Sequence, residues 1–536
     1  MIIEKFLENV ESRPNSIAFI DYKSRKLRNK TYQDVYLDML KVVSYFEVNQ
    51  INNQSKILIF LKPSYEFYLI LLSGILRHYQ MIVIESFNDK DKLKRMVTLS
   101  NPDYIVVDSK TKLIKNIIKP FKNLKSINIS KYHKFQANFK DINYNFKDPV
   151  LLTFTSGSTG YPKLIKRTIQ DLENQYSLIL NTIDNIDQND IVLALNPIYV
   201  LANLVFGITS IIFSKNQNKK SNTKLLEKIL TITNANTINA SISKYLIFNS
   251  PLSFIKKAYS GGSLISLQDA KKIKELFPNT YFTYVYGASE VVLMSKTSID
   301  DYIKNLEEGK ICIGKIVSEI DLKIDEPDKY GVGEIIARGK VVLCNDDLYH
   351  HTGDIGYIKD GQVYLIGRKK MSSSEFNIYN YDIEMKVLQE FKEISKVAFF
   401  VYNNFYYLFY EAKIDYIKEI KNFLSIDCRI LRIKKMPIDI RHHYKIDYNK
   451  LIDLLKEGSM NKNYKTFRFV FWNIIYVVIG IIVFLIPNIM DVIGWLFLKE
   501  TLHSNIYFNI IGGVLAGEIV FLMIREKLLK NNKNNL

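Results

Sequence analysis

Short apolar segments alternate with longer amphipathic segments through the first 150 residues of the chain. The short segments have the length and composition of strands, and the longer ones carry apolar residues at helical spacing. Strands that alternate with helices form mainly parallel sheets, because each crossover helix returns the chain to the same edge. The sequence therefore predicts an α/β fold, with strands at 17–20, 56–60, 81–85 and 104–107 and helices at 32–46, 65–76 and 91–99.

The pattern continues further along the chain, with a predicted strand at 191–195, a buried helix or loop-helix at 200–213 and a helix at 267–276. With 536 residues and 47% hydrophobic content, the chain can form several domains. The formal net charge of +18 would suit a nucleic acid or an anionic membrane. Lysine, asparagine and isoleucine are abundant throughout, so we attribute most of this charge to general composition and predict no nucleic-acid partner.

Two further features concern the compartment. Cys312, Cys344 and Cys428 lie far apart, which favours neither a disulfide framework nor a zinc site. The N-terminal segment has acidic residues and no continuous apolar core, which argues against a cleaved signal peptide. We therefore expect this part of the chain in the cytoplasm.

An apolar segment at 151–154 leads into a loop of serine, threonine and glycine, and Lys163 follows it. Glycines can expose backbone N–H groups to an anion, hydroxyl groups add donors, and the lysine adds a positive charge. The spacing differs from the G-x-x-x-x-G-K-[ST] of P-loop NTPases, which excludes that family. A flexible linker would have a similar composition, so a phosphate-binding loop and a linker both remain open. The candidate phosphate donors are Thr155, Ser156, Gly157, Ser158, Thr159 and Gly160.

The segment TSGSTGYPK resembles the phosphate-binding signature of the AMP-forming adenylating enzymes, which include acyl-CoA synthetases, peptide-synthetase adenylation domains and luciferases. The segment YGASE resembles the YGxTE motif of the same superfamily. Tyr286 and Gly287 would then lie against adenine, Ser289 would donate to a phosphate oxygen, and Glu290 would hold Mg²⁺ through a hard oxygen ligand. The resemblance also places a turn with two glycines, Gly261 and Gly262, against the adenine.

The segment HTGDIGY, followed by GQVYLIGR, is predicted to form a loop, a hairpin and a basic end. It resembles the ribose site of the superfamily. There Asp354 would accept hydrogen bonds from both ribose hydroxyls, and Arg368 would add a fixed positive fork. The residue that matches the family's hinge is Lys370, and Lys445 matches the lysine that bridges the carboxylate substrate and the phosphate.

The resemblance implies a large adenylation domain at 1–367, with mainly parallel sheets and a β-rich subdomain, and a small α+β lid at 368–456. This chain also departs from the family pattern. Ser372–Glu375 replaces the glycine pair after the hinge, and a bulky Glu375 puts thioester formation in doubt more than adenylation. The segment 197–203 lacks the histidine of many acyl and aryl ligases and the aspartate of amino-acid activators, which favours an apolar acid.

The composition changes abruptly after residue 456. Segments 467–486 and 505–524 are apolar and long enough to span a bilayer, and basic residues flank their outer ends. We predict a linker at 457–466, a transmembrane hairpin at 467–525 and a basic cytoplasmic tail at 526–536. The protein would then be a multi-pass cell-membrane protein with its catalytic domain in the cytoplasm.

Together these features predict an ATP-dependent, AMP-forming carboxylic acid ligase that uses Mg²⁺, activates an apolar, fatty acid and transfers it to CoA. Among the superfamily, the chain resembles long-chain fatty acid–CoA ligases. One alternative is an enzyme that loads a carrier protein or another nucleophile without CoA. A second is a catalytically degenerate nucleotide-binding membrane protein. The sequence leaves the oligomeric state open.

Overall fold

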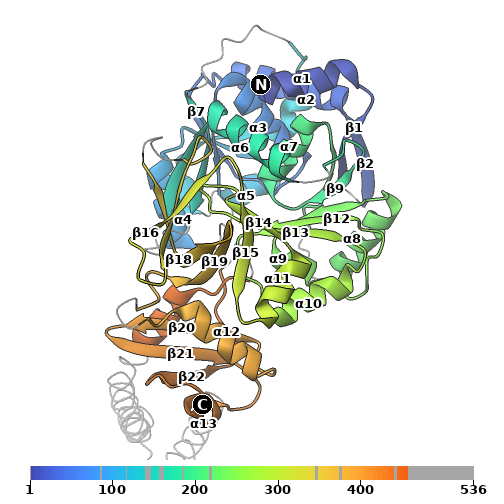
Figure 1. Cartoon of the computed structure of the whole chain (residues 1–536). Helices are drawn as coiled ribbons and strands as arrows, with labels where there is room; N and C mark the ends of the chain where they lie inside the picture. Colours follow the sequence, from blue (N-terminus) through green and yellow to red (C-terminus); the bar gives the residue numbers. More distant parts are fainter. Residues whose placement is uncertain are drawn as a thin grey trace, which may run out of the picture. The chain divides into compact units, whose positions relative to one another are not determined.

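The computed structural model describes residues 2–23, 25–84, 87, 89–115, 118–138, 147–155, 162–183, 186–215, 220–343, 348–373, 377–439 and 444–456 (Figure 1). The chain divides into two compact units, Met1–Tyr448 and Asn449–Leu536. The architecture below is that of the first unit. Within the described ranges no helix has the length and apolar character needed to cross a membrane. The predicted spans at 467–486 and 505–524, together with the linker and the basic tail, lie outside those ranges.

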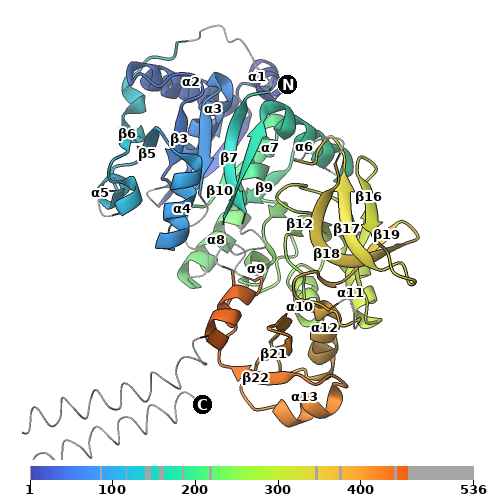
Figure 2. The same ribbon diagram turned by 90° about the vertical axis from the view of Figure 1, so that its left-hand side faces the viewer.

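The first sheet has six strands in the order β6-β5-β3-β4-β7-β8. All neighbouring pairs are parallel except β7 and β8, which form an antiparallel pair. Helices α2, α3 and α4 accompany these strands (Figure 2), which confirms the predicted alternation. The strands are β3 (Lys56–Ile59), β4 (Gln80–Val83), β5 (Tyr104–Val107), β6 (Lys125–Asn128), β7 (Pro149–Thr155) and β8 (Lys163–Thr168).

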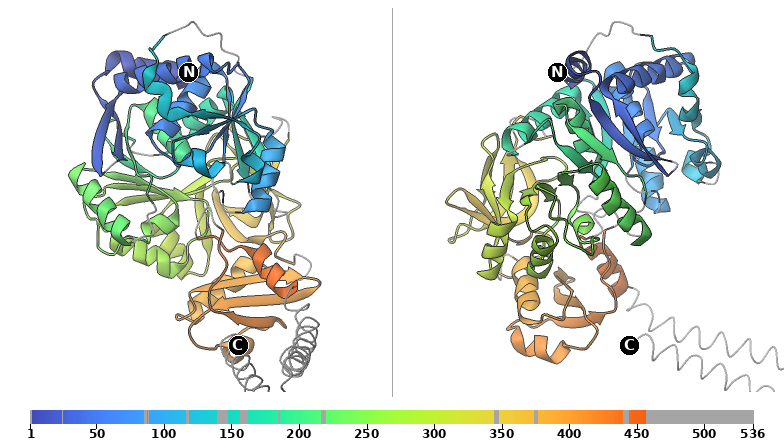
Figure 3. Two further views of the ribbon diagram at one scale, coloured as in Figure 1. Left: turned by 180° about the vertical axis from the view of Figure 1, so that it is seen from behind. Right: turned by 90° about the vertical axis from the view of Figure 1, so that its right-hand side faces the viewer.

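Two helices of this region begin at threonines whose side chains cap free N–H groups. Thr31 caps α2 and exchanges hydrogen bonds with Asp34, and Thr168 caps α6 in the same way with Asp171. The blue and cyan elements stay grouped in both views of Figure 3. The helices that precede β9 in the chain are α1 (Ile2–Ser12), α2 (Tyr32–Val48), α3 (Tyr65–Arg77), α4 (Lys90–Ser100), α5 (Thr111–Lys115), η1 (Lys119–Phe121), η2 (Ile129–Lys134) and α6 (Ile169–Thr182).

The second sheet has thirteen strands in the order β16-β17-β18-β19-β15-β14-β13-β12-β11-β9-β10-β1-β2. The run from β13 to β1 is parallel, and the remaining pairs are antiparallel. The predicted parallel and β-rich parts are both present, and one continuous sheet joins them. Its parallel and edge strands are β1 (Ile17–Lys23), β2 (Lys26–Thr31), β9 (Ile191–Ala194), β10 (Thr209–Ile212), β11 (Thr237–Asn239), β12 (Lys257–Gly261) and β13 (Tyr281–Tyr286).

The β-rich strands and the remaining helices of this part follow in the chain. The strands are β14 (Ser295–Ser298), β15 (Ile311–Ile316), β16 (Asp321–Asp325), β17 (Gly333–Arg338), β18 (His350–Lys359) and β19 (Gln362–Arg368). The helices are α7 (Pro197–Phe206), α8 (Lys220–Ile232), α9 (Ile242–Tyr245), α10 (Leu267–Leu276) and α11 (Ile299–Glu307).

The structure corrects the predicted buried helix or loop-helix at 200–213. Helix α7 ends at Phe206, because Gly207 adopts a left-handed conformation with φ of 81° and terminates the helix. The chain then forms strand β10, which pairs in parallel with β1 on one side and β9 on the other. An apolar run does not by itself distinguish a helix from a buried strand, and here pairing with two neighbours determines the strand.

A second correction concerns the segment HTGDIGY, which was predicted to be a loop. It lies in strand β18, between β17 and β19. Both pairings shift register close to this segment, and Gly353 has a φ of 73°. The irregularity explains how a turn-like sequence can lie within a strand, because a bulge takes up the extra residue.

The lid region has its own three-stranded sheet in the order β20-β21-β22. Strands β20 and β21 form an antiparallel hairpin, and β22 is parallel to β21. A separate core that includes Val387, Phe399, Leu408 and Ile420 holds the helices to this sheet, consistent with a small α+β lid. The elements are α12 (Asn380–Glu390), β20 (Lys396–Tyr402), β21 (Phe405–Glu411), α13 (Ile417–Phe423) and β22 (Arg429–Ile433).

Candidate nucleotide-binding site

Asp354 lies at the centre of a polar cluster formed by three strands. Its carboxylate accepts a hydrogen bond from the Tyr286 hydroxyl, with 2.8 Å between the oxygens. The Arg368 Nε lies 2.8 Å from the other carboxylate oxygen. Asp354 and Arg368 are also opposite each other in the β18–β19 pair. The structure therefore brings together three residues that the sequence assigned to adenine and ribose.

Arg368 is held from several directions. Its Nε also donates to the Tyr381 hydroxyl at 3.1 Å, and its Nη1 donates to the Thr352 carbonyl at 3.2 Å. The negative charge of Asp354 raises the pKa of Arg368, and burial raises the pKa of Tyr286 well above its usual value. Asp354 is 5% exposed and has two oxygens that can each accept more than one hydrogen bond. A nucleotide hydroxyl can therefore bind the same carboxylate that these protein donors orient.

Gly261 and Gly262 lie at the end of β12, next to the end of β13 that carries Tyr286. Strands β12 and β13 are parallel and place Gly261 opposite Val285. A Cβ on Gly261 would come within 2.5 Å of the Val285 carbonyl oxygen, so only glycine fits this close approach. Gly262 has a φ of 86°, which favours glycine for a second reason. The turn thus begins at the carboxyl edge of the parallel strands, where α/β sheets bind ligands.

Glu290 lies on a compact turn that follows β13. The backbone of Ala288 and Val291 forms reciprocal hydrogen bonds of 2.8 and 3.2 Å, and the Leu343 N–H donates to the Glu290 carbonyl at 2.9 Å. Among the described residues, none donates a hydrogen bond to the half-buried Glu290 carboxylate. A carboxylate on a fixed backbone with open oxygens suits Mg²⁺, which prefers hard oxygen ligands. The side chain of Ser289 is exposed on the same turn.

Arg167 contacts this turn and was not identified from the sequence. It lies in β8 and is 4% exposed. Its Nη2 donates to the Ser289 carbonyl at 2.6 Å, and its Nη1 donates to the Thr153 Oγ1 at 2.7 Å. Residues 165 and 167 are the buried positions of β8. Alternate residues of a strand face the same side, so Arg167 shares the buried side with Ile165. A charged residue at such a position was the sequence signal that could have identified Arg167.

The glycine-rich loop itself, residues 156–161, lies outside the described residues. The structure does place its two ends, because the last residue of β7, Thr155, pairs with the first residue of β8, Lys163. Lys163 is exposed at this point. The roles of Ser156, Gly157, Ser158, Thr159 and Gly160 in phosphate binding remain predictions.

The predicted hinge follows β19. Lys370 is exposed, and its neighbour Lys369 lies 2.7 Å from the buried carboxylate of Glu334. Glu334 also accepts a hydrogen bond from the Gly353 N–H at 3.0 Å, and it lies 3.1 Å from the His351 ring. The ammonium group of Lys369 therefore balances the negative charge of Glu334, and Lys370 is not required for this. The role of Lys370 as a hinge remains a prediction. So does the effect of Glu375 on thioester formation, and Glu375 lies outside the described residues.

Lys445 lies beside a residue that anchors its segment to α10. The Tyr444 hydroxyl donates to Asp269 at 2.5 Å and accepts from the Ser266 N–H at 3.3 Å. Ser266 follows the Gly261–Gly262 turn by a few residues. The Lys445 carbonyl accepts a hydrogen bond from the Asp439 N–H at 2.7 Å, which closes the local loop. The segment that carries the predicted catalytic lysine therefore contacts the helix that follows the glycine turn.

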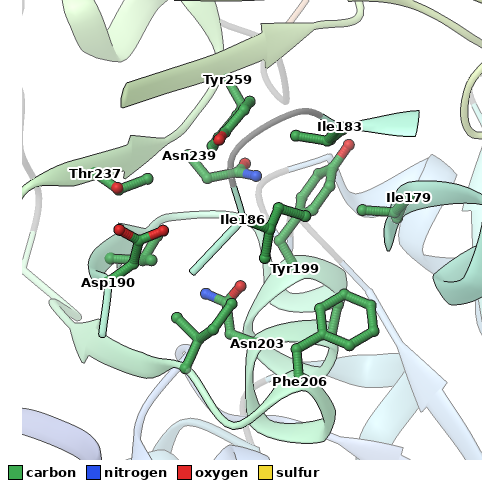
Figure 4. A pocket seen from close by; sticks show the side chains of 13 residues that line it. Ile179, Ile183, Ile186, Asp190, Tyr199, Asn203, Phe206, Thr237, Asn239 and Tyr259 are labelled. Carbon is green, nitrogen blue, oxygen red and sulfur yellow. The ribbon is translucent and has the colours of Figure 1, made fainter. Parts of the chain in front are cut away.

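A small pocket lies between α6, α7 and one face of the second sheet (Figure 4). Tyr199 and Phe206 reach it from α7, and Asn239 and Tyr259 reach it from β11 and β12. The cavity has a volume of about 30 Å³. Its complete lining is Ile179, Ile183, Ile186, Asp190, Val192, Tyr199, Ala202, Asn203, Phe206, Ile208, Thr237, Asn239 and Tyr259.

An ion pair lies at one end of this pocket. Asp190 precedes β9, and both of its carboxylate oxygens lie 2.8 Å from the Lys257 Nζ. The Asn236 side chain also donates to Asp190 at 2.9 Å. Asn239 ends β11 and therefore marks the carboxyl edge of the sheet, where β12 reaches Gly261. The pocket thus extends along the sheet from the nucleotide-site edge toward a charged pair at the opposite edge.

The sequence is similar to those of known ligases. The 2-succinylbenzoate–CoA ligase of Staphylococcus epidermidis is 28% identical over 265 residues, which cover 45% of this chain and 54% of that protein. The D-alanine–D-alanyl carrier protein ligase of Lactococcus lactis is 24% identical over 448 residues, which cover 74% of this chain and 83% of that protein. The chain spans about half the length of the first curated relatives that it matches.

The fold also matches a solved structure. O-succinylbenzoate coenzyme A synthetase from Bacillus subtilis, in complex with ATP and magnesium ion, has a TM-score of 0.68 and 15% sequence identity. The match covers 82% of this chain and 98% of that chain. Residues 6–343, more than half of the sequence, match the AMP-binding enzyme family. Because this family match extends over more than half of the sequence, the chain belongs to the AMP-binding enzyme family.

Proposed function

We propose that this protein is an ATP-dependent, AMP-forming ligase that activates an apolar carboxylic acid as its acyl-adenylate and transfers it to CoA. The observation that carries the proposal is the joining of Tyr286, Asp354 and Arg368 beside the Gly261–Gly262 turn. These residues would bind adenosine, and Glu290 would hold Mg²⁺ near the phosphates. The protein would act mainly by positioning the acid and by neutralising charge on the phosphates, with Lys445 bridging the two.

The pocket beside α7 supports an apolar acid and favours a small one. Most of its lining is aliphatic or aromatic, and a water occupies about 10–15 Å³ by the same measure of volume. The pocket therefore has space for about two or three groups of that size. A long chain would require side chains to move or the Asp190–Lys257 pair to separate. A short acid fits this pocket better than the long-chain fatty acid that the sequence suggested.

ATP–pyrophosphate exchange with a series of straight-chain acids, from acetate to palmitate, tests this proposal. We expect exchange with short acids, and we expect Ala202→Leu, which fills the pocket, to shift the preference toward shorter ones. Ile229→Ala is a control for general disturbance of the core, because Ile229 is similarly buried in α8 but does not line the pocket. Absence of exchange with every acid would refute the ligase, and a preference for palmitate in the wild type would refute the size limit.

A carrier protein is the alternative acceptor, and two observations favour it. The alignment with the D-alanine–D-alanyl carrier protein ligase covers 74% of this chain, against 45% for the 2-succinylbenzoate–CoA ligase. Glu375, which replaces a glycine that the family usually has, also fits an acceptor other than CoA. AMP release with and without added CoA separates the two functions. Exchange without CoA-dependent AMP release would favour the carrier.

We also propose that residues 467–525 anchor the protein at the cell membrane as a hairpin, with the catalytic domain in the cytoplasm. The support is the sequence alone: two long apolar segments with basic residues at their outer ends. Carbonate extraction of membranes from cells that express the full chain provides the test. We expect the protein to stay in the pellet, and its release into the supernatant would contradict the proposal.

A further inference from the structure

Arg167 connects two parts of the nucleotide site that come from different sheets. Strands β7 and β8 of the first sheet flank the glycine-rich loop, and Arg167 and its partner Thr153 lie on these strands. The turn that carries Glu290 follows β13 of the second sheet. The Arg167 Nη2 donates to the carbonyl of Ser289, the residue before Glu290, at 2.6 Å.

The geometry of this contact requires an arginine. The two terminal nitrogens of one planar guanidinium point to two acceptors, the Thr153 hydroxyl and the Ser289 carbonyl. A lysine has one charged nitrogen on a flexible stem and lacks this fixed fork. In the described part of the chain, Arg167 is the only arginine among the buried residues. Burying a charged group is costly, so a buried arginine with two such contacts indicates a specific role.

We propose that Arg167 is a positioning residue that fixes the Glu290 turn against the strands of the phosphate loop, so that Glu290 can hold Mg²⁺ beside the phosphates. This inference rests on the proposed function, because it assumes that Glu290 holds the metal. Arg167 itself does not touch substrate.

The coupling between Mg²⁺ and ATP binding tests this role. Calorimetry on the full chain would measure ATP affinity with excess Mg²⁺ and with EDTA, and the ratio gives the gain due to the metal. Arg167→Met keeps an unbranched apolar stem and removes both donors. We expect the gain to fall at least about tenfold, because hydrogen bonds that involve a charged group are stronger than those between neutral groups. ATP affinity in EDTA should stay within about twofold of the wild type.

Companion variants make the test specific. Arg167→Lys keeps the charge and one donor, and Thr153→Val removes one of the two acceptors, so both should reduce the gain less than Arg167→Met. Arg77→Met is the matched control. Arg77 is partly buried at the end of α3 and binds Glu47 of α2 at 2.6 Å, so it forms an ion pair outside the nucleotide site. The control should keep the full gain.

The outcomes separate this role from a purely structural one. Equal weakening of ATP binding with Mg²⁺ and with EDTA would overturn the proposal, as would an unchanged gain in Arg167→Met. If Arg167→Met does not fold, an unchanged gain in both Arg167→Lys and Thr153→Val overturns it. A wild type that binds Mg·ATP but shows no exchange would refute the ligase and leave Arg167 testable. A wild type that does not bind ATP would refute both.

Discussion

The buried carboxyl of Glu384 gives a prediction whose size follows from the structure. Glu384 lies on α12 in the lid and is 8% exposed. Its Oε1 accepts from the Phe399 N–H at 2.8 Å, the Tyr448 hydroxyl at 2.6 Å and the Asn380 side chain at 3.3 Å. Burial outweighs these donors and raises the pKa of Glu384 from its usual 4.5 to about 7.

The raised pKa makes the lid less stable as pH increases. Below the usual pKa the carboxyl is protonated in both the folded and the unfolded chain, so its pKa costs no stability. Between pH 4.5 and 7 the unfolded chain loses the proton first, and the free energy of unfolding falls. One pKa unit corresponds to about 1.4 kcal/mol, so the full cost above pH 7 is about 3 kcal/mol.

Glu384→Gln should recover this free energy. The glutamine oxygen can accept the same three hydrogen bonds, because all of them go to Oε1. We expect the variant to be more stable than the wild type by about 3 kcal/mol at pH 8 and by less than about 1 kcal/mol at pH 4.5. Hydrogen exchange of the β20–β21 hairpin measures this local stability, and protection at pH 8 should rise by about a hundredfold.

A neighbouring residue provides the control for this experiment. Asp382 lies on the same helix, but its side chain is 42% exposed and binds Lys386 at 2.8 Å. Asp382→Asn should change protection little, because exposed ion pairs contribute little to stability. Equal protection of wild type and Glu384→Gln at pH 8, or a stability gap that does not grow between pH 4.5 and pH 8, would refute the reasoning.

Three other predictions concern the nucleotide site. Glu290→Ala should abolish Mg²⁺-dependent pyrophosphate exchange, and full exchange in this variant would show that another residue holds the metal. Tyr286→Phe removes one donor to Asp354, so the KM for ATP should rise by about three- to tenfold while the KM for the acid stays constant. Steady-state kinetics measures both KM values, and an equal rise in both would contradict this prediction. Gly261→Ala should lower the thermal midpoint of unfolding, because its Cβ would lie 2.5 Å from the Val285 carbonyl oxygen. An unchanged midpoint would mean that β12 and β13 can move apart to accommodate the added methyl group.

Much of the fold could be predicted from periodicity. Helix α10 matches its predicted bounds, because Ser266 caps its start and its apolar residues follow the helical period. Residues 209–212 could not be assigned in this way, since their strand exists only through pairing with β1 and β9. The same holds for the segment HTGDIGY, where the neighbouring strands β17 and β19 override a turn-like sequence.

The candidate site shows a similar division. Motifs in chain order identified Tyr286, Asp354 and Arg368, and the structure joins them through side-chain contacts. Arg167 and Glu384 have no comparable motif. Their importance comes from burial and from partners distant in sequence, such as Ser289 and Phe399, which only the folded chain brings near. Sequence motifs therefore predicted the chemical roles of single residues, whereas roles that depend on tertiary contacts could be identified only from the structure.

The continuous thirteen-stranded sheet has a practical consequence for protein engineering. The pocket is built by α6, α7 and the neighbouring strands β9 and β11, with Tyr259 from β12, whereas Asp354 and Arg368 lie on β18 and β19. These two groups of elements occupy different segments of the chain and different positions in the sheet order. A chimera that exchanges residues 169–239 with a relative could therefore acquire a new acid preference and keep its affinity for ATP.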